Sequence, residues 1–86
     1  MEAYDVLIRP LISEKAVNMI ETENKIVFLV RNAATKLDIK KAMEKEYKVK
    51  VDHVNTVITR KGQKRAIIKL AKEFKASDLS NKLGMV

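Results

Sequence analysis

Residues that commonly form catalytic, redox or base-stacking sites are scarce in this sequence. It has no cysteine or tryptophan, one histidine, one proline and two glycines among 86 residues. The lack of cysteine excludes disulfides and thiolate metal sites and fits a reducing cytoplasm. His53 is the only histidine, and no serine has a base at a recognisable spacing. We therefore expect no enzyme, no cofactor and no metal site, and we interpret His53 as an ordinary surface or half-buried residue.

Long apolar runs are absent as well. The run Ile26 to Val30 is far below the roughly 20 residues that a membrane-spanning helix needs, so no membrane insertion is expected. Glu2, Asp5 and Arg9 interrupt the first residues, and no secretory signal is expected either. Sequence 1–86 has the length and the 47% apolar content of a single compact domain.

Positive charge is what the sequence has in excess. Eighteen Lys and Arg face eleven Asp and Glu, a net charge of +7, and the pI is about 9.8. The imbalance lies in one part of the chain: residues 1–24 hold two bases and five acids, whereas residues 25–86 hold sixteen bases and six acids. A polyanion such as nucleic acid is the expected partner of the basic part.

The first half of the chain predicts strand, helix, strand, helix. Asp5–Ile8 is predicted as a strand that ends at Arg9 and Pro10, because proline disfavours helical geometry in the residue before it. Ser13 is a predicted N-cap for an amphipathic helix. Ile26–Val30 is β-rich and apolar enough for a central strand buried on both faces. Thr35 and Asp38 resemble a capping box. The buried stripe predicted for the helix that follows is Ile39, Ala42, Met43 and Tyr47, with Leu37 off the stripe.

The second half predicts a hairpin and a last short helix. Val49–Thr59 is dense in β-branched residues and predicts a strand anchored by Val54, Val57 and Ile58. Gly62 can supply a positive φ in the connection Arg60–Arg65, after which Ala66–Leu70 returns as a strand. Ser77 is the predicted cap of the last helix, which carries Leu79 and Leu83 and ends at Gly84. The predicted order is β-α-β-α-β-β-α.

The connection Arg60–Arg65 is the most informative cluster of charge. Four of its six residues are cations, which repel each other unless an anion neutralises them. A solvated charged turn is the alternative, and further cations favour binding: Lys25, Lys36, Lys40, Arg31 and Lys69. Because the few aromatics leave no stacking platform, folded RNA held by phosphate and 2′-hydroxyl contacts fits better than stacked single strands.

Two other constellations have competing interpretations. Arg9 and Asn55 invite comparison with a small acyl-phosphate hydrolase, but the segment 9–13 has a proline and no glycine, so it lacks the backbone donors of a phosphate cradle. The acidic helix stripe Glu14, Asn18 and Glu21 is either a solvated face or a protein-docking surface.

Four motifs, in matching order and spacing, resemble the universal large-subunit ribosomal protein family number twenty-three. They are Arg9–Ala16, Ala34–Lys36 with Ile39, Lys40 and Ala42, Val54–Thr56, and Lys61–Ala66 leading into Lys69 and Leu70. The resemblance covers essentially the whole chain. The ending Leu83–Gly84 resembles the archaeal form of the family, and the connection 59–65 is shorter than the long basic extension of bacterial members.

The resemblance implies an α/β (α+β) fold in which a four-stranded antiparallel sheet carries helices on both faces. It implies a single ribosomal RNA-binding domain in the cytoplasmic large subunit, near the peptide exit tunnel. Implied partners are large-subunit ribosomal RNA, protein number twenty-nine, and exit-site factors such as the signal recognition particle. Glu14 matches an acid that bacterial members use in chaperone docking. With the charge pattern, the motifs predict these RNA-binding residues: Arg9, Lys36, Lys40, Asn55, Thr56, Arg60, Lys61, Lys64 and Arg65.

Two further function classes stay open at this point. A free-standing RNA or DNA chaperone would use the same cations without sequence selectivity. A sheet-forming protein adaptor would carry the basic surface only incidentally.

Overall fold

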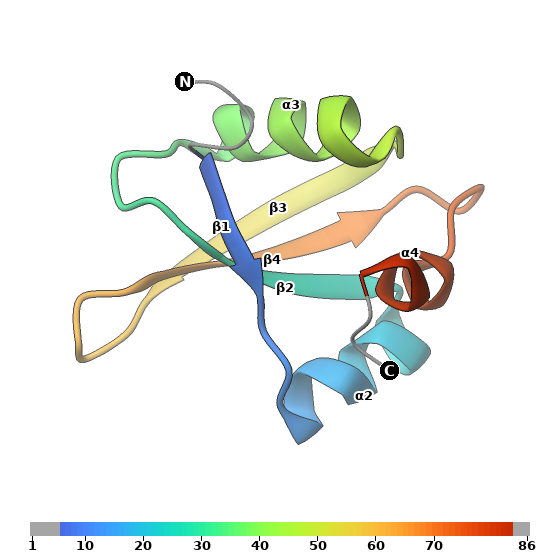
Figure 1. The fold of residues 1–86 in the computed structure, drawn as a ribbon, viewed down its shortest axis with the longest axis horizontal. Helices are drawn as coiled ribbons and strands as arrows, with labels where there is room; N and C mark the ends of the chain where they lie inside the picture. Colours follow the sequence, from blue (N-terminus) through green and yellow to red (C-terminus); the bar gives the residue numbers. More distant parts are fainter. Residues whose placement is uncertain (1–5, 84–86) are drawn as a thin grey trace.

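The computed structural model describes residues 6–83, which form one antiparallel sheet and three helices (Figure 1). The strands are β1 (Leu7–Pro10), β2 (Lys25–Val30), β3 (Val51–Ile58) and β4 (Lys64–Leu70), arranged in the order β1-β2-β4-β3. The helices are α2 (Glu14–Glu23), α3 (Lys36–Tyr47) and α4 (Ala76–Lys82). The predicted fold class is confirmed.

The strand register divides the side chains between two faces of the sheet, because successive residues of a strand point to opposite sides. We call them the α3 face and the α2 face, after the helix on each side. Ile26, Phe28 and Val30 of β2 pair with Ile68, Ala66 and Lys64 of β4, and these six side chains belong to the α3 face. The α2 face comprises Arg9, Lys25, Val27, Leu29, His53, Asn55, Val57, Arg65, Ile67 and Lys69.

The core lies between the α3 face and helices α3 and α4. As predicted, Ile39, Ala42 and Met43 are buried on α3, and Tyr47 packs edge-on against Phe28 with ring centroids 5.9 Å apart. Ala76 and Leu79 of α4 complete this core. β2 is central and buried from Ile26 to Val30, as predicted. Leu37, which lies off the predicted stripe, is 59% exposed.

Both predicted helix starts on α2 and α3 are confirmed. The Ser13 hydroxyl accepts a hydrogen bond from the Ala16 N–H at 3.2 Å, which satisfies a donor that the helix itself leaves unpaired. Thr35 and Asp38 form the reciprocal capping box, with N–H to oxygen distances of 3.2 and 3.1 Å. The hydrogen bonds from Thr35 lower the pKa of the Asp38 carboxyl, because they stabilise its charged form.

The predicted boundaries of β1, β3 and β4 and two of the three predicted anchors of β3 are wrong; β3 spans Val51–Ile58 rather than Val49–Thr59. β1 continues through Arg9 and Pro10, which is possible because an edge strand tolerates a residue without an N–H; Asp5 lies outside the described residues. β4 begins at Lys64 rather than Ala66. Val54 is an anchor of β3, but Val57 and Ile58 are 51% and 68% exposed, since β3 is an edge strand. Val51 is the second buried position.

The last helix is also capped differently from the prediction. Ser77 lies inside α4, and the preceding residue Lys75 makes no side-chain capping bond. Instead, Asn24 at the end of α2 accepts a hydrogen bond from the Ala76 N–H through its Oδ1 at 2.7 Å. Leu79 is buried and Leu83 partly buried, as expected, while Gly84 lies outside the described residues. Among residues 6–83, no helix has the length and apolar character to cross a membrane.

Candidate nucleic-acid interface

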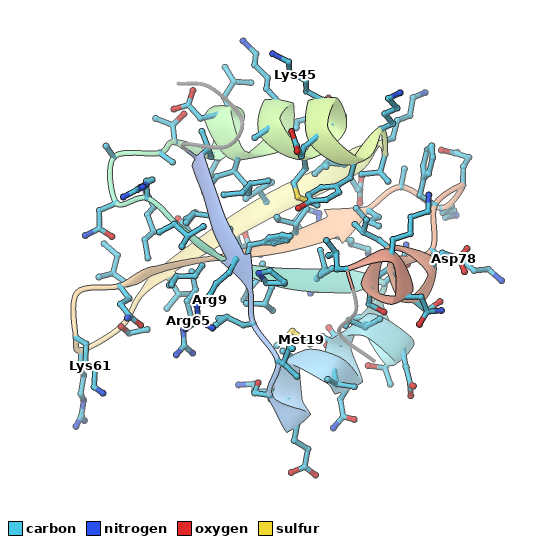
Figure 2. All side chains as sticks on the ribbon, in the orientation of Figure 1. Arg9, Met19, Lys45, Lys61, Arg65 and Asp78 are labelled. Atoms are coloured by element: carbon cyan, nitrogen blue, oxygen red, sulfur yellow. The ribbon has the colours of Figure 1, made fainter. Side chains whose placement is uncertain are left out.

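Two arginines stand in one row across the α2 face. Arg9 of β1 and Arg65 of β4 both pair with Leu29 of β2, one on each side. Strands are about 4.8 Å apart, so the two Cα atoms are roughly 10 Å apart. Both arginines are exposed, and their side chains lie on the same side of the ribbon in Figure 2. Within residues 6–83, neither has a carboxylate partner.

The remaining rows of this face add polar and cationic side chains. Asn55, exposed, pairs with Ile67 opposite Val27. Lys25 and Lys69 pair with each other, and His53 stands on the far side of Lys69. Lys25 is partly neutralised by Glu23, whose Oε1 lies 3.2 Å from the lysine Nζ. The positive potential of the face is therefore strongest around Arg9 and Arg65.

The hairpin presents two further cations at its turn. Gly62 adopts φ 79°, the conformation predicted for it, and its N–H donates to the Thr59 carbonyl at 2.9 Å. The Thr59 N–H donates to the Gln63 carbonyl at 2.8 Å and closes the turn. Arg60 and Lys61 are exposed, and Lys61 projects from the tip of the hairpin in Figure 2. Because these hydrogen bonds already fix the backbone of the turn, binding of a ligand to its cations costs little further backbone entropy.

Two predicted RNA-binding residues belong to the α3 face instead. Lys64 pairs with Val30, is half-buried, and donates from its Nζ to the Ala34 carbonyl at 2.6 Å. Thr56 pairs with Ala66 and is half-buried on the same face. The prediction counted Lys64 as part of a loop, but as a strand residue it must alternate with Arg65. The structure thus separates Lys64 and Thr56 from Arg9, Asn55 and Arg65.

The two predicted lysines of α3 form a separate arm of positive charge. Lys36 and Lys40 are one helical turn apart and therefore on one side of α3. The loop before α3 is tied to the hairpin, because the Asn32 side chain donates to the Gly62 carbonyl at 2.9 Å and Lys64 reaches Ala34. The first turn of α3 is consequently held on the hairpin side of the molecule. A single long polyanion can therefore contact the hairpin and the two lysines of α3 together.

Sequence reasoning missed two features of this region. Lys15 of α2 is exposed and lines a hollow on the α2 face together with Arg65. Asn24 holds the junction of α2, β4 and α4 through hydrogen bonds to Leu70, Phe74 and Ala76. The partners of Asn24 lie 46 to 52 positions away, beyond the reach of local patterns. Lys15 is not among the residues predicted to bind RNA.

The acidic stripe of α2 points away from the interface. Glu14, Asn18 and Glu21 are all exposed, and Ala16 and Ile20 on the other side of the helix are buried. Their spacing places the three on one side of the helix. The stripe therefore has the geometry for contact with another molecule or with water.

The geometry gives no support to the hydrolase alternative. Arg9 and Asn55 lie on β1 and β3, the two opposite edges of the sheet. Among residues 6–83, no group of three or more His, Asp or Glu is arranged to hold a metal ion. The His53 Nδ1 lies 3.5 Å from the neighbouring Asp52 carboxylate, and both side chains are about half exposed.

Fold and surface together define a small basic α/β protein with a cationic sheet face and hairpin and an acidic helix. Comparison with known proteins identifies its family. Residues 5–77 match the model of the family described as ribosomal protein L23, and the chain belongs to that family. It is 45% identical to the large ribosomal subunit protein uL23 of Methanothermobacter thermautotrophicus and 46% identical to that of Methanococcus aeolicus, over 99% of each chain.

The predicted class is confirmed by this membership: a ribosomal protein of the large subunit and not an enzyme. The predicted localisation on the cytoplasmic ribosome follows with it. Both relatives are archaeal, in line with the predicted archaeal-type form.

Proposed function

We propose that this protein binds large-subunit ribosomal RNA through the α2 face and the hairpin, as a permanent constituent of the subunit. The observation that supports this best is the set of exposed cations Arg9, Arg65, Arg60 and Lys61, none of which has a carboxylate partner within residues 6–83. Uncompensated cations on two adjoining surfaces attract a polyanion. Phosphate contacts position an RNA-binding protein, and arginine can make them in pairs.

Each cluster of residues has its own task in this proposal. Arg9 and Arg65 hold phosphates above the sheet, Arg60 and Lys61 clamp them at the hairpin, and Asn55 adds short hydrogen bonds. Lys36 and Lys40 contact a second segment of the same RNA. Lys64 and Thr56 act indirectly: Lys64 fixes the hairpin base to the loop before α3 through Ala34, and Thr56 packs beside it on the α3 face.

We further propose that the protein sits near the peptide exit tunnel and contributes to the docking of exit-site factors. The acidic stripe Glu14, Asn18 and Glu21 has the opposite sign to the RNA-binding surface, so it would be left for a protein partner. Protein number twenty-nine and the signal recognition particle are the partners that the family resemblance suggests. The hairpin turn is short, and we assign it to RNA binding rather than to the tunnel wall.

A free-standing nucleic-acid chaperone is the competing function, and retention on ribosomes separates the two. Tagged full-length protein is expressed in the source organism, and large subunits are washed in high salt. We expect one copy per subunit after the wash, because many simultaneous contacts to folded RNA dissociate slowly. Loss of the protein into the wash, or recovery with bulk RNA of every kind, would support the chaperone instead.

A further inference from the structure

The α2 face contains two adjoining hollows of different character. One, of about 180 Å³, is lined by Leu11, Ser13, Lys15, Ala16, Met19, Val27, Val57, Arg65 and Ile67. The other, of about 350 Å³, is lined by Arg9, Pro10, Leu11, Ile12, Ser13 and Arg65. They share Leu11, Ser13 and Arg65. The first is mainly aliphatic, whereas the second is lined by both Arg9 and Arg65.

The aliphatic hollow exists because α2 covers only part of the sheet. Helix α2 contributes Lys15, Ala16 and Met19 to its lining, and the buried Ala16 is too small to fill the space above Val27 and Ile67. Val27 is buried, Ile67 is half-buried and Val57 is 51% exposed. These aliphatic side chains are partly exposed to water. A ligand that covers them with an apolar surface binds favourably, because it removes apolar area from water.

We propose that the paired hollows receive one unpaired nucleotide of the ribosomal RNA, with its base against the aliphatic wall and its phosphate between Arg9 and Arg65. The inference rests on the proposed RNA-binding function and deepens it. A nucleotide carries a flat, largely apolar ring beside an anion, and the two hollows offer those environments next to each other. Lys15 at the mouth of the aliphatic hollow adds a cation for the neighbouring phosphate.

This occupant also agrees with how proteins read RNA. Sequence-specific recognition mostly targets loops and bulges, whose bases can leave the stack and enter a protein pocket. Among residues 6–83, no aromatic residue lines either hollow, so the base packs on aliphatic side chains instead of stacking. An apolar side chain of a neighbouring ribosomal protein, followed by a carboxylate, is the alternative that the experiment must distinguish.

Crosslinking from inside the hollow identifies the occupant directly. A photoreactive diazirine amino acid replaces Met19 in the full-length protein, which is bound to transcripts of the source organism's large-subunit RNA and, separately, assembled into subunits. We expect crosslinks to one unpaired nucleotide in both samples. Crosslinks to a ribosomal protein in the subunit, or to scattered paired nucleotides, would overturn the proposal.

The affinity for RNA of a variant in which a larger side chain fills the aliphatic hollow tests the proposal quantitatively. Ile67→Phe puts a larger side chain into the aliphatic hollow, and Ile58→Phe is the matched control on an exposed position of the same sheet. We expect Ile67→Phe, and equally deletion of the crosslinked nucleotide, to weaken RNA binding by about tenfold, and their combination to cost little more. Ile58→Phe should bind as wild type does, and circular dichroism verifies the fold of each variant.

The outcomes separate this inference from the function on which it rests. If no variant and no wild-type protein binds the RNA, the proposed function itself fails. If the wild type binds tightly and Ile67→Phe and the nucleotide deletion both leave the affinity unchanged, the RNA interface stands and the nucleotide hollow is refuted.

Discussion

At the scale of single residues, two non-glycine positions within residues 6–83 adopt a positive φ, and their surroundings differ. Asn24 and Lys48 both end helices with φ 55°, a region that costs an L-residue about 1–2 kcal/mol. Asn24 offsets that cost with hydrogen bonds to Leu70, Phe74 and Ala76. The side chain of Lys48 makes no such hydrogen bonds to the residues that the structure describes.

Replacement of each residue by glycine should therefore have opposite effects on stability. Asn24→Gly relieves the backbone but removes the hydrogen bonds, and we expect it to lower the free energy of unfolding by about 2 kcal/mol. Lys48→Gly relieves the backbone alone and should raise it by up to about 1 kcal/mol. Urea unfolding of the two variants measures both. Equal effects at the two sites would contradict the role assigned to Asn24.

At the scale of secondary structure, local patterns predicted the elements well where neighbours in sequence are also partners in space. The capping box of Thr35 and Asp38 and the buried stripe of α3 depend on residues three or four apart. Val57 and Ile58 were wrong as anchors because β-branched composition indicates a strand but not its position in the sheet. The edge position of β3 depends on β4 pairing with β2, which no local pattern contains.

The candidate site shows the same division. The cationic turn and the positive φ of Gly62 could be predicted from the residues alone. The row of Arg9, Leu29 and Arg65 could not, because it requires the register of three strands. The assignment of Lys64 failed for a smaller reason: Lys64 was placed in the connecting loop, so the alternation of side chains along a strand was not applied to it.

Lys61 and Lys64 should accordingly differ in function although they are three residues apart. Lys64→Ala removes the hydrogen bond to Ala34, so we expect a loss of about 1 kcal/mol in unfolding free energy. Lys61→Ala removes an exposed cation and should leave stability unchanged while weakening RNA binding. Thermal unfolding and RNA titration of each variant separate the effects. Reversal of the two patterns would show that Lys64 is the contact residue.

At the scale of the whole molecule, the proposed RNA-binding surface and the acidic stripe carry charges of opposite sign. Arg9, Arg65, Arg60 and Lys61 lie on the α2 face and the hairpin, while Glu14 and Glu21 occupy the outer side of α2. A net charge of +7 alone would allow weak binding to any polyanion. Arg9 and Arg65, which have no carboxylate partner within residues 6–83, lie beside an aliphatic hollow. This arrangement favours a specific RNA surface, because the shape of the hollow restricts which part of an RNA can bind beside the two charges.

The salt dependence of RNA binding tests the central claim most directly. Arg9, Arg60, Lys61 and Arg65 are changed to Ala in one variant, and Lys41, Lys48, Lys72 and Lys82 in a control that loses the same charge. If the α2 face and hairpin bind phosphate, the log–log salt slope of the first variant should shrink by about three to four, and that of the control should change little. Equal slopes for the two variants would mean that net charge, and not this surface, holds the RNA.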